Sequence, residues 1–309
     1  HNAKTFDYRP SIEDTNNEIR KFDENDVKGY DKLLKTSKDI FEIGFEKLSD
    51  KPFISFWEMA KQLPSLIKLK SYLTVSQLVN SKLKNKYLRK AFSIHPLLVG
   101  GNPFTTTSIY ALIHYLERKW GVYFCMGGTG KIVKELENLM VRQGIDIKKQ
   151  SDVERISITN GKAENVVLTD GSKIEADLVI CNADPPTVYS EMLPSKYSRD
   201  SLLKPKKFTH YSMGLYVLFF GSKKKFSDVA HHTIWMSERY KELLHDIFEK
   251  KILTDDFSLY LHRPTATDET FAPEGCDSFY VLCPVPNLQG DVQWDSEGPK
   301  LKEKIVEAL

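Results

Sequence analysis

The stretch HPLLVGGNPFTTTSIYALIHYLERKWGVYFCMGGTGK, residues 95–131, carries the most information about the fold. Residues 100–103 (GGNP) interrupt the helical pattern, which resumes over Ser108–Trp120. The stretch ends in a glycine-rich loop, Gly127–Lys131, at the start of another predicted helix. The loop is not a phosphate-binding P-loop, because Ile132 stands where that motif needs Ser or Thr. On its own residues, the loop predicts a tight entry into a helix. The chain contains neither a Gly-x-Gly-x-x-Gly fingerprint nor a Gly-x-Ser-x-Gly elbow.

Helices are predicted before this stretch, and strands become frequent after it. Residues 1 to about 118 show apolar side chains at helical spacing, whereas Asn160-Gly161 is a strong hairpin signal between two short strand patterns. The predicted strands are Val153–Ile158, Val166–Leu168, Leu178–Cys181, Leu215–Phe220, Phe257–His262 and Ser278–Pro284, and Glu238–Glu249 is a predicted helix. A helical lobe, a small α/β piece and a final mixed lobe together predict an α/β (α+β) protein.

The positive charge is concentrated in one segment. The net charge of the chain is +2, but residues 59–116 contain no Asp or Glu and carry +8, which leaves −6 on the remainder. Apolar residues recur there at helical spacing, in the groups Leu66, Leu69, Tyr72, Leu73 and Val79, Leu83, Tyr87. A basic amphipathic helix can lie on an anionic membrane, but the pattern suits a core helix with a solvated basic face equally well. The apolar stripe argues against a nucleic-acid partner.

Cysteine and histidine usage predicts neither disulfides nor a metal site. The four cysteines form no Cys-x-x-Cys pair, which is typical of a protein from a reducing cytoplasm. His231 and His232 are adjacent, but no carboxylate or thiol stands at ligand spacing from them, so we predict no metal. The apolar runs are shorter than the ~20 residues of a membrane-spanning helix. Because the chain starts at His1 and stops at Leu309 within a helical pattern, we expect both ends to be internal to a longer protein.

Several segments resemble the bacterial carotenoid desaturases of the phytoene desaturase family. The longest is residues 95–130, and its length makes the resemblance specific. The others follow in the same order along the chain: Asp26-Val27 with Gly29-Tyr30, Phe257–His262 (FSLYLH), Ala272–Cys276 (APEGC) and Val281–Pro286 (VLCPVP). The resemblance covers nearly the whole chain.

The resemblance implies a multi-segment, Rossmann-like FAD domain with an inserted substrate domain of mixed helix and sheet. Residues 1–118 would be a helical substrate and membrane-contact lobe, 119–190 the middle segment of the FAD domain, and 191–309 an α+β substrate domain. The first and last FAD segments, including the dinucleotide fingerprint, would lie outside this chain. The implied FAD-binding residues are Gly127, Gly128, Val153, Asn182, Ala183 and Asp184.

The chemistry implied by the resemblance is oxidative. Oxidised flavin accepts a hydride from an allylic carbon of a polyene, a proton leaves the neighbouring carbon, and the protein supplies orientation and a dry tunnel. Relatives often carry an Arg-Asp pair after Ser-Phe, followed by a further Arg. Here Ser55-Phe56 is followed by Trp57 and Glu58, with Lys61 at the later position. Glu58 and Lys61 are the predicted catalytic residues, Glu58 as a proton acceptor or a stabiliser of the polyene cation. The alternative for Glu58 is an ordinary surface carboxylate.

The remaining expectations concern substrate, membrane and electron acceptor. His95, Asn102 and Pro103 of the longest matching segment are the predicted substrate-binding residues. Phytoene and related polyenes must be taken from a bilayer, which favours the basic segment as a contact with an anionic membrane surface. We therefore expect a cytoplasmic protein that is peripheral on the inner membrane, with quinone or oxygen as the electron acceptor.

Three other functions are weighed against desaturation. A carotenoid isomerase of the same superfamily would use reduced flavin without net electron transfer, and the match from His95 to Glu117 favours a desaturase over it. An amine oxidase is disfavoured by the apolar, aromatic-rich substrate lobe. The third alternative is an inert or lipid-binding fragment, because the chain lacks the dinucleotide fingerprint.

Overall fold

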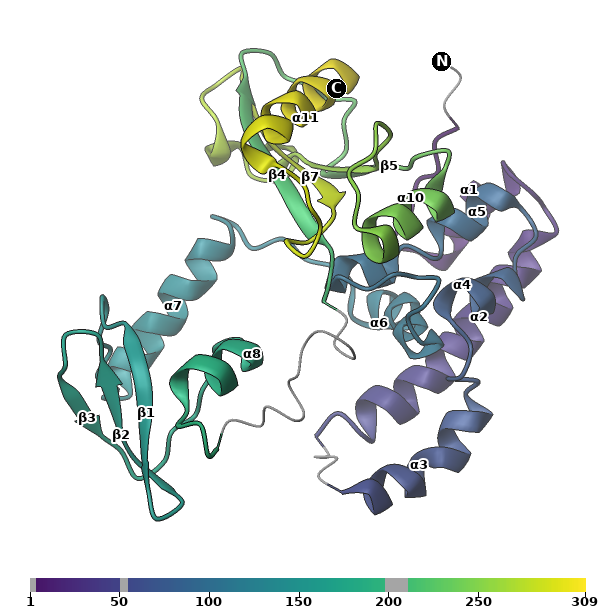
Figure 1. Cartoon of the computed structure of the whole chain (residues 1–309). Coiled ribbons are helices and arrows are strands. Elements are labelled where there is room, and N and C mark those ends of the chain that lie inside the picture. The colour runs from purple at the N-terminus through teal and green to yellow at the C-terminus, as the bar shows by residue number, and fades with distance from the viewer. Residues whose placement is uncertain (1–3, 51–54, 198–210) are drawn as a thin grey trace. The chain divides into compact units, whose positions relative to one another are not determined.

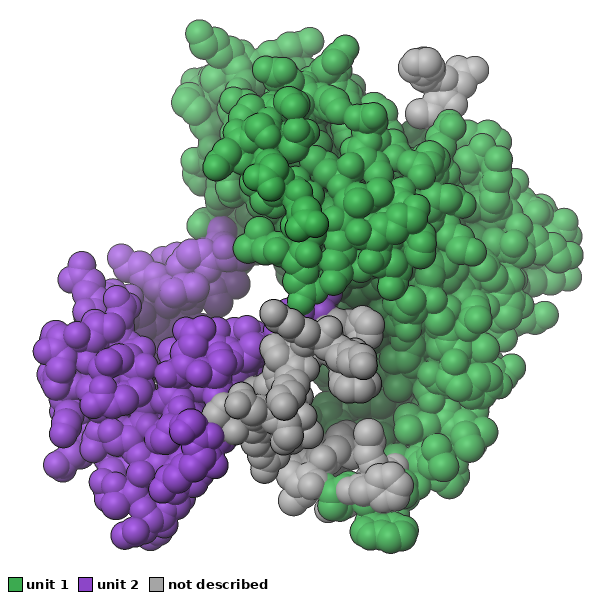
Figure 2. All heavy atoms as spheres, in the orientation of Figure 1, with its two compact units in different colours: residues 1–127, 212–309 green, residues 128–211 purple. Residues whose placement is uncertain are grey.

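A computed structural model describes residues 4–50, 55–197 and 211–309. The chain forms two compact units, coloured separately in Figure 2: unit 1 comprises residues 1–127 and 212–309, and unit 2 comprises residues 128–211. The helical N-terminal part and the sheet of the C-terminal part therefore belong to one unit. The predicted domain boundaries near residues 118 and 190 refer to the architecture of the family and stay predictions.

The N-terminal part of unit 1 is helical, as predicted. Its helices are α1 (Ile12–Arg20), α2 (Asp26–Phe41), η1 (Glu42–Glu46), α3 (Phe56–Lys68), α4 (Val75–Asn80), α5 (Lys86–Ala91), η2 (His95–Val99), η3 (Ser108–Ala111) and α6 (Leu112–Trp120) (Figure 1). Side-chain caps fix the N-termini of two of these helices. The Ser11 hydroxyl accepts a hydrogen bond from Asp14 N–H at α1, and Thr74 and Gln77 form a capping box at α4. The apolar faces meet in one core, in which Tyr30 of α2 and Phe92 after α5 are fully buried.

The basic segment is not one long amphipathic helix. Its second apolar group is divided: Val79 and Leu83 are buried in the core with residues of α2, whereas Tyr87 is 41% exposed. Its first group is divided: Leu69 is buried in the core, whereas Tyr72 is exposed. Part of the segment therefore packs in the core, whereas apolar side chains of α3 and others such as Tyr72 and Tyr87 are exposed, and a membrane contact stays a prediction.

The C-terminal part of unit 1 is an antiparallel sheet with one helix against it. The strand order is β4-β7-β6-β5, with β4 (Gly214–Ser222), β7 (Asp277–Val285), β6 (Leu259–His262) and β5 (His232–Trp235). The intervening and following elements are α10 (Tyr240–His245), η5 (Asp246–Lys250), η6 (Pro264–Ala266), η7 (Glu269–Phe271) and α11 (Trp294–Ala308). Figure 1 shows α11 beside β4 and β7. Three of these strands are confirmed predictions, and the predicted helix Glu238–Glu249 is α10 continued by η5.

Unit 2 contains a helix, a three-stranded sheet and a short C-terminal helix. Its elements are α7 (Thr129–Arg142), β1 (Val153–Thr159), β2 (Lys162–Leu168), β3 (Lys173–Glu175), α8 (Pro185–Thr187) and η4 (Val188–Met192). The hairpin at Asn160-Gly161 is confirmed, with Gly161 at φ +82°.

The predicted strand Leu178–Cys181 is wrong for this chain. The segment has no strand partner within the described part of unit 2, and Leu178 and Ile180 are 76% and 88% exposed. A short apolar segment becomes a strand only where another strand can pair with it. Its apolar side chains therefore lie on a surface that the described part of unit 2 leaves exposed.

No helix in the described ranges is long and apolar enough to cross a membrane.

Candidate functional site

One face of the four-stranded sheet is mostly apolar, and among the described residues of unit 1 most of its side chains are at least partly exposed; we call it the open face. The register places its residues in rows that cross the strands. One row is Phe219, Tyr280, His262 and His232, the next is Val217, Leu282, Tyr260 and Ile234, and a third pairs Leu215 with Pro284. Residues directly opposite each other in antiparallel strands share a face, so these ten side chains form one surface.

The two faces of the sheet differ in what covers them. Alternate residues of β7 are buried, because Val281, Cys283 and Val285 pack with Leu301 and Ile305 of α11. On the open face the exposure is much larger, reaching 75% at Phe219, 47% at Leu215 and 43% at Val217 of β4. A contiguous exposed apolar surface of this kind marks a binding site. With nine residues each, β4 and β7 extend it over about 30 Å.

The open face ends in a cluster of imidazole rings, which we name the histidine cluster: His231, His232 and His262. The β5–β6 register sets His232 opposite His262, and a nitrogen atom of each of the three rings lies within 4.8 Å of the others. The Tyr260 hydroxyl is hydrogen-bonded to Nδ1 of His232 (2.6 Å) and of His262 (3.2 Å). The Tyr280 ring stacks on His262, with centroids 4.4 Å apart. The cluster therefore continues the aromatic row of the open face.

The imidazoles of the cluster are held neutral. Burial, followed by the neighbouring rings His231 and His232, lowers the pKa of His262 to about 4. Burial is also the first cause that lowers the pKa of His231 and of His232. Neutral imidazoles at this spacing can ligate a divalent transition metal. Here, however, a tyrosine hydroxyl occupies the position between His232 and His262, so hydrogen bonding already accounts for the arrangement.

The first residue of the glycine-rich loop, Gly127, belongs to unit 1 and lies at the same end of the sheet. Gly127 adopts φ +85°, a backbone conformation that favours glycine, and its N–H donates to the Asp268 carboxylate (2.8 Å). Hydrogen bonds from Thr270 and from this N–H lower the pKa of Asp268. The Phe124 ring, three residues before Gly127, contacts His231 (4.8 Å between centroids) and His262 (6.1 Å). The segment from Phe124 to Gly127 is thus anchored beside histidines that the sequence did not connect with it.

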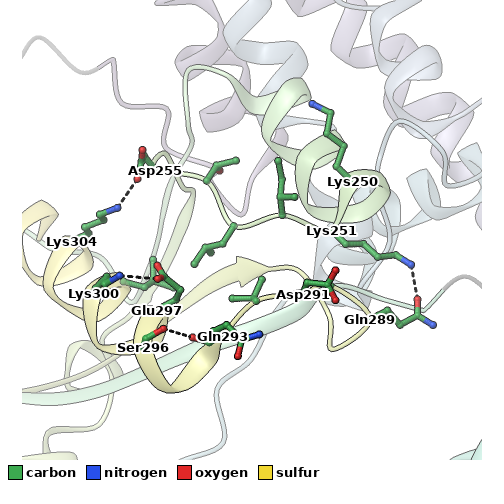
Figure 3. A pocket seen from close by; sticks show the side chains of 16 residues that line it. Lys250, Lys251, Asp255, Gln289, Asp291, Gln293, Ser296, Glu297, Lys300 and Lys304 are labelled. Carbon is green, nitrogen blue, oxygen red and sulfur yellow. Dashed lines mark hydrogen bonds and ion pairs between the residues drawn. The ribbon is translucent and has the colours of Figure 1, made fainter.

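A separate cavity of about 520 Å³ lies between α11 and the loops around residues 251 and 290 (Figure 3). Several of its charged residues pair with one another: Lys304 pairs with Asp255, and Lys300 with Glu297. The Lys251 ammonium donates to the Gln289 carbonyl. These paired charges make it an unsuitable site for an apolar ligand.

The predicted substrate-binding residues have structural partners within the helical lobe. His95 is buried, lies 3.4 Å from the Glu117 carboxylate and contacts the ring of His114 (4.2 Å). Asn102 is buried, and its side-chain oxygen accepts from Phe104 N–H. The Pro103 carbonyl accepts from Ser76 N–H. Each of the three residues thus has a structural contact within the helical lobe, and substrate contact by them stays a prediction.

The predicted catalytic residues lie on α3, away from the elements of the open face. Lys61 is exposed. Glu58 belongs to the same helix, but its side chain is outside the described part of the structure. Their catalytic roles stay predictions.

The predicted cofactor residues, apart from Gly127, lie in unit 2. Gly128 is the N-cap of α7 at φ +82°, and Val153 is the first residue of β1. The Asn182-Ala183-Asp184 turn is exposed directly before α8. Several apolar side chains of α7 are also exposed, including Val133 (66%) and Leu136 (54%). Within the described residues of unit 2, α7 thus presents apolar side chains to solvent, and the role of this unit as the middle segment of a cofactor domain stays a prediction.

Sequence comparison then decides the family. The sequence profile of the family described as flavin containing amine oxidoreductase matches residues 7–256. The chain belongs to this family. Family membership confirms three predictions: the oxidoreductase class, the flavin cofactor, and a mixed fold. The family has a Rossmann-like FAD domain, as predicted.

Similar proteins in this family are phytoene desaturases. The chain is 42% identical to the lycopene-forming phytoene desaturase of Pseudescherichia vulneris, over 99% of this chain and 63% of that protein. It is 41% identical to the lycopene-forming enzyme of Paracoccus sp. (99% and 62%) and 38% identical to the neurosporene-forming enzyme of Rhodobacter capsulatus (94% and 57%). The chain thus spans about three fifths of the length of these curated relatives.

Solved structures support the fold. An oxidoreductase from Methanosarcina mazei aligns with a TM-score of 0.57 at 18% identity, over 82% of this chain and 57% of that one. The PF1083 protein from Pyrococcus furiosus aligns with a TM-score of 0.55 at 16% identity, over 76% and 53%.

Proposed function

We propose that the whole protein is an FAD-dependent phytoene desaturase, which extends the conjugation of phytoene and related polyenes in carotenoid biosynthesis. The observation that carries the proposal is the open face: a long, apolar, aromatic surface that suits a hydrocarbon chain and offers no carboxylate for an amine. The identities of 38–42% to enzymes named phytoene desaturases favour it over an isomerase or a lipid-binding role.

In this proposal the chain's residues bind and orient the substrate. The polyene lies across the rows of the open face, in contact with Phe219, Val217 and Tyr280, and the histidine cluster marks the polar end. Gly127, Gly128, Val153 and the 182–184 turn would hold part of the FAD, which supplies hydride acceptance when bound. Electrons would pass on to quinone or oxygen.

The test is pigment analysis of phytoene-accumulating cells that express the whole protein. Visible absorption should appear as conjugation lengthens. Val217→Lys should lower phytoene consumption at least about tenfold, because a charge on the open face must be desolvated against hydrocarbon. Val306→Lys, on the exposed side of α11, is the matched control and should leave consumption unchanged. Unchanged phytoene with folded, flavin-loaded protein would refute the desaturase proposal.

We also propose that α3 contacts an anionic membrane surface and keeps the protein peripheral on the cytoplasmic side of the inner membrane. Leu63 and Ile67 are one helical turn apart and are 55% and 57% exposed, and Tyr72 beyond the helix is 69% exposed. The lysines at 61, 68 and 70 are exposed in the same segment. Apolar side chains flanked by lysines are the composition that binds head groups.

Vesicle sedimentation tests the membrane proposal. Ile67→Asp should weaken binding to vesicles containing phosphatidylglycerol at least about tenfold, since burying one such side chain contributes roughly 2 kcal/mol. Val306→Asp is the control. Equal binding by both variants, or binding of the unaltered protein to neutral vesicles alone, would contradict the role of α3.

A further inference from the structure

The histidine cluster is the one part of the open face that is built to exchange protons. The ten residues of that face include no carboxylate, lysine or arginine, and only Tyr260, Tyr280 and the imidazoles of His232 and His262 carry polar groups. His231 lies beside them, and its Nδ1 is hydrogen-bonded to the Thr267 hydroxyl (2.5 Å). A desaturation removes a proton as well as a hydride, so a surface that binds the polyene needs an acceptor.

We propose that the His232–His262 pair, joined through the Tyr260 hydroxyl, accepts the proton that the polyene loses. This inference rests on the proposed desaturase function. In the step, one allylic C–H bond breaks and its hydrogen leaves with both electrons, as hydride, to the flavin. A C–H bond on the neighbouring carbon then breaks, its electron pair becomes the new carbon–carbon double bond, and the proton bonds to an imidazole nitrogen.

The hydrogen-bond geometry leaves room for that proton. The Tyr260 oxygen and the Nδ1 atoms of His232 and His262 form a triangle with sides of 2.6, 3.2 and 3.4 Å. When both rings carry their own hydrogen on Nε2, the tyrosine hydroxyl supplies a single proton to these three contacts. A second proton can therefore be held between the two Nδ1 atoms and shared by both rings.

The low basicity of the cluster suits this particular task. A carbon next to an allylic cation is a strong acid, so a weak base is sufficient to take its proton. A neutral ring also avoids the repulsion that an imidazolium would exert on the developing cation. The pKa of His262 is lowered to about 4, first by burial and then by His231 and His232, so the ring is free to accept near neutral pH.

The surroundings give the proton a way out. His262 is buried beneath Phe124 and Tyr280, whereas His232 lies on the edge strand β5 and is exposed. A proton taken at the buried ring can pass through Tyr260 to the exposed ring and then to water. The positive charge of Arg263 helps to lower the pKa of His231, and the Arg263 guanidinium donates a hydrogen bond to the Asp277 carboxylate.

The experiment compares His232→Gln, His262→Gln and the double variant with His245→Gln, an exposed histidine of α10 outside the cluster. The whole protein, loaded with flavin, is mixed anaerobically with phytoene in liposomes, and the bleaching of the flavin is followed. The double variant should reduce its flavin about 10²- to 10⁴-fold more slowly, as for loss of a general base. His245→Gln should match the unaltered protein, and imidazole in solution should restore part of the rate to His262→Ala.

A second readout does not depend on turnover. Diethyl pyrocarbonate modifies neutral imidazoles, and a bound polyene should slow the modification of His232 and His262 while leaving His245 unaffected, as read by mass spectrometry. Because His232 is exposed at an edge, His232→Gln keeps the test valid even if His262→Gln fails to fold.

The outcomes separate this inference from the proposed function. An unaltered protein that does not bleach with phytoene would remove the proposed function itself. Bleaching at the normal rate in the double variant, with a large loss in Glu58→Gln instead, would assign the proton to Glu58 and overturn the role of the cluster. One equivalent of a transition metal in the purified protein, lost in His262→Gln, would also overturn it, because the ring nitrogens would be occupied.

Discussion

Replacing Asp277 with alanine should lower the free energy of unfolding by about 3–5 kcal/mol, the range for breaking a buried ion pair from one side. Asp277 begins β7, is 2% exposed, and accepts from Phe226 N–H (2.6 Å), the Thr265 hydroxyl (2.5 Å) and the Arg263 guanidinium (3.2 Å). Without it, the Thr265 hydroxyl and the Phe226 N–H lose their acceptor, and the buried Arg263 guanidinium loses its charged partner while keeping the Phe226 carbonyl. The loss is a large fraction of the roughly 5–15 kcal/mol that stabilises a domain.

Urea unfolding followed by tryptophan fluorescence measures this change. Asp255→Ala is the control, because Asp255 also forms a short ion pair, with Lys304 (2.6 Å), but its side chain is 97% exposed. Its unfolding midpoint should stay that of the unaltered chain, since exposed pairs contribute little. Similar midpoints for Asp277→Ala and Asp255→Ala would show that the buried network does not hold β7 to the segment before β5.

The Asp277 carboxylate should also make the free energy of unfolding of unit 1 fall at low pH. Burial alone would raise the pKa of Asp277, but the hydrogen bonds from Thr265, Phe226 N–H and Arg263 outweigh it and lower the pKa. Its stabilisation is therefore complete above the unfolded value of about 4 and is lost as the pH falls through the lower folded value. Asp277→Asn should reduce the dependence of the unfolding free energy on pH below about 4. An unchanged dependence in this variant would show that Asp277 is not the group responsible.

The sheet was partly predictable because its strands carry local patterns. The strands β4, β6 and β7 are aromatic and apolar runs bounded by turn residues, and each was predicted to within two residues of its observed ends. The strand β5 was not predicted. It has four residues, begins with the second of two histidines, and exists because it pairs with β6, whose partner residues lie 24 to 30 positions further along. Such pairing leaves no signal in the local sequence.

The candidate site was harder to predict for the same reason. His231 and His232 had no ligand-type neighbour at short spacing, and His262, thirty residues later, was assigned only to a strand. The pairing register of β5 with β6 brings the three rings together. The alternation of apolar and polar residues along a strand does not tell which of its two faces a helix will cover. The signal that could have found the site is the aromatic and imidazole content of Tyr260, His262 and Tyr280, once β6 and β7 are assumed to be neighbours.

A motif recognised by resemblance can also have a purely architectural role, and Asp26 is the clearest case. The Asp26-Val27 and Gly29-Tyr30 match lies at the start of α2. The Asp26 carboxylate is buried and accepts from the N–H groups of Lys84 and Asn85, both at 2.7 Å. A side chain at Gly29 would place its Cβ 2.3 Å from the Lys82 carbonyl oxygen. Both residues therefore serve the close approach of α2 to the turn between α4 and α5.

Asp26→Ala should accordingly lower the free energy of unfolding by about 3 kcal/mol, because two buried N–H groups lose a charged acceptor at roughly 1–3 kcal/mol each. Asp26→Asn should cost less, since the amide keeps one acceptor oxygen. Asp31→Ala, on the exposed side of the same helix, is the matched control and should leave the unfolding midpoint unchanged. Hydrogen exchange should locate the loss at the amides of residues 84 and 85. A variant that keeps full stability and slow exchange there, yet no longer consumes phytoene in the whole protein, would instead make Asp26 a residue of the reaction.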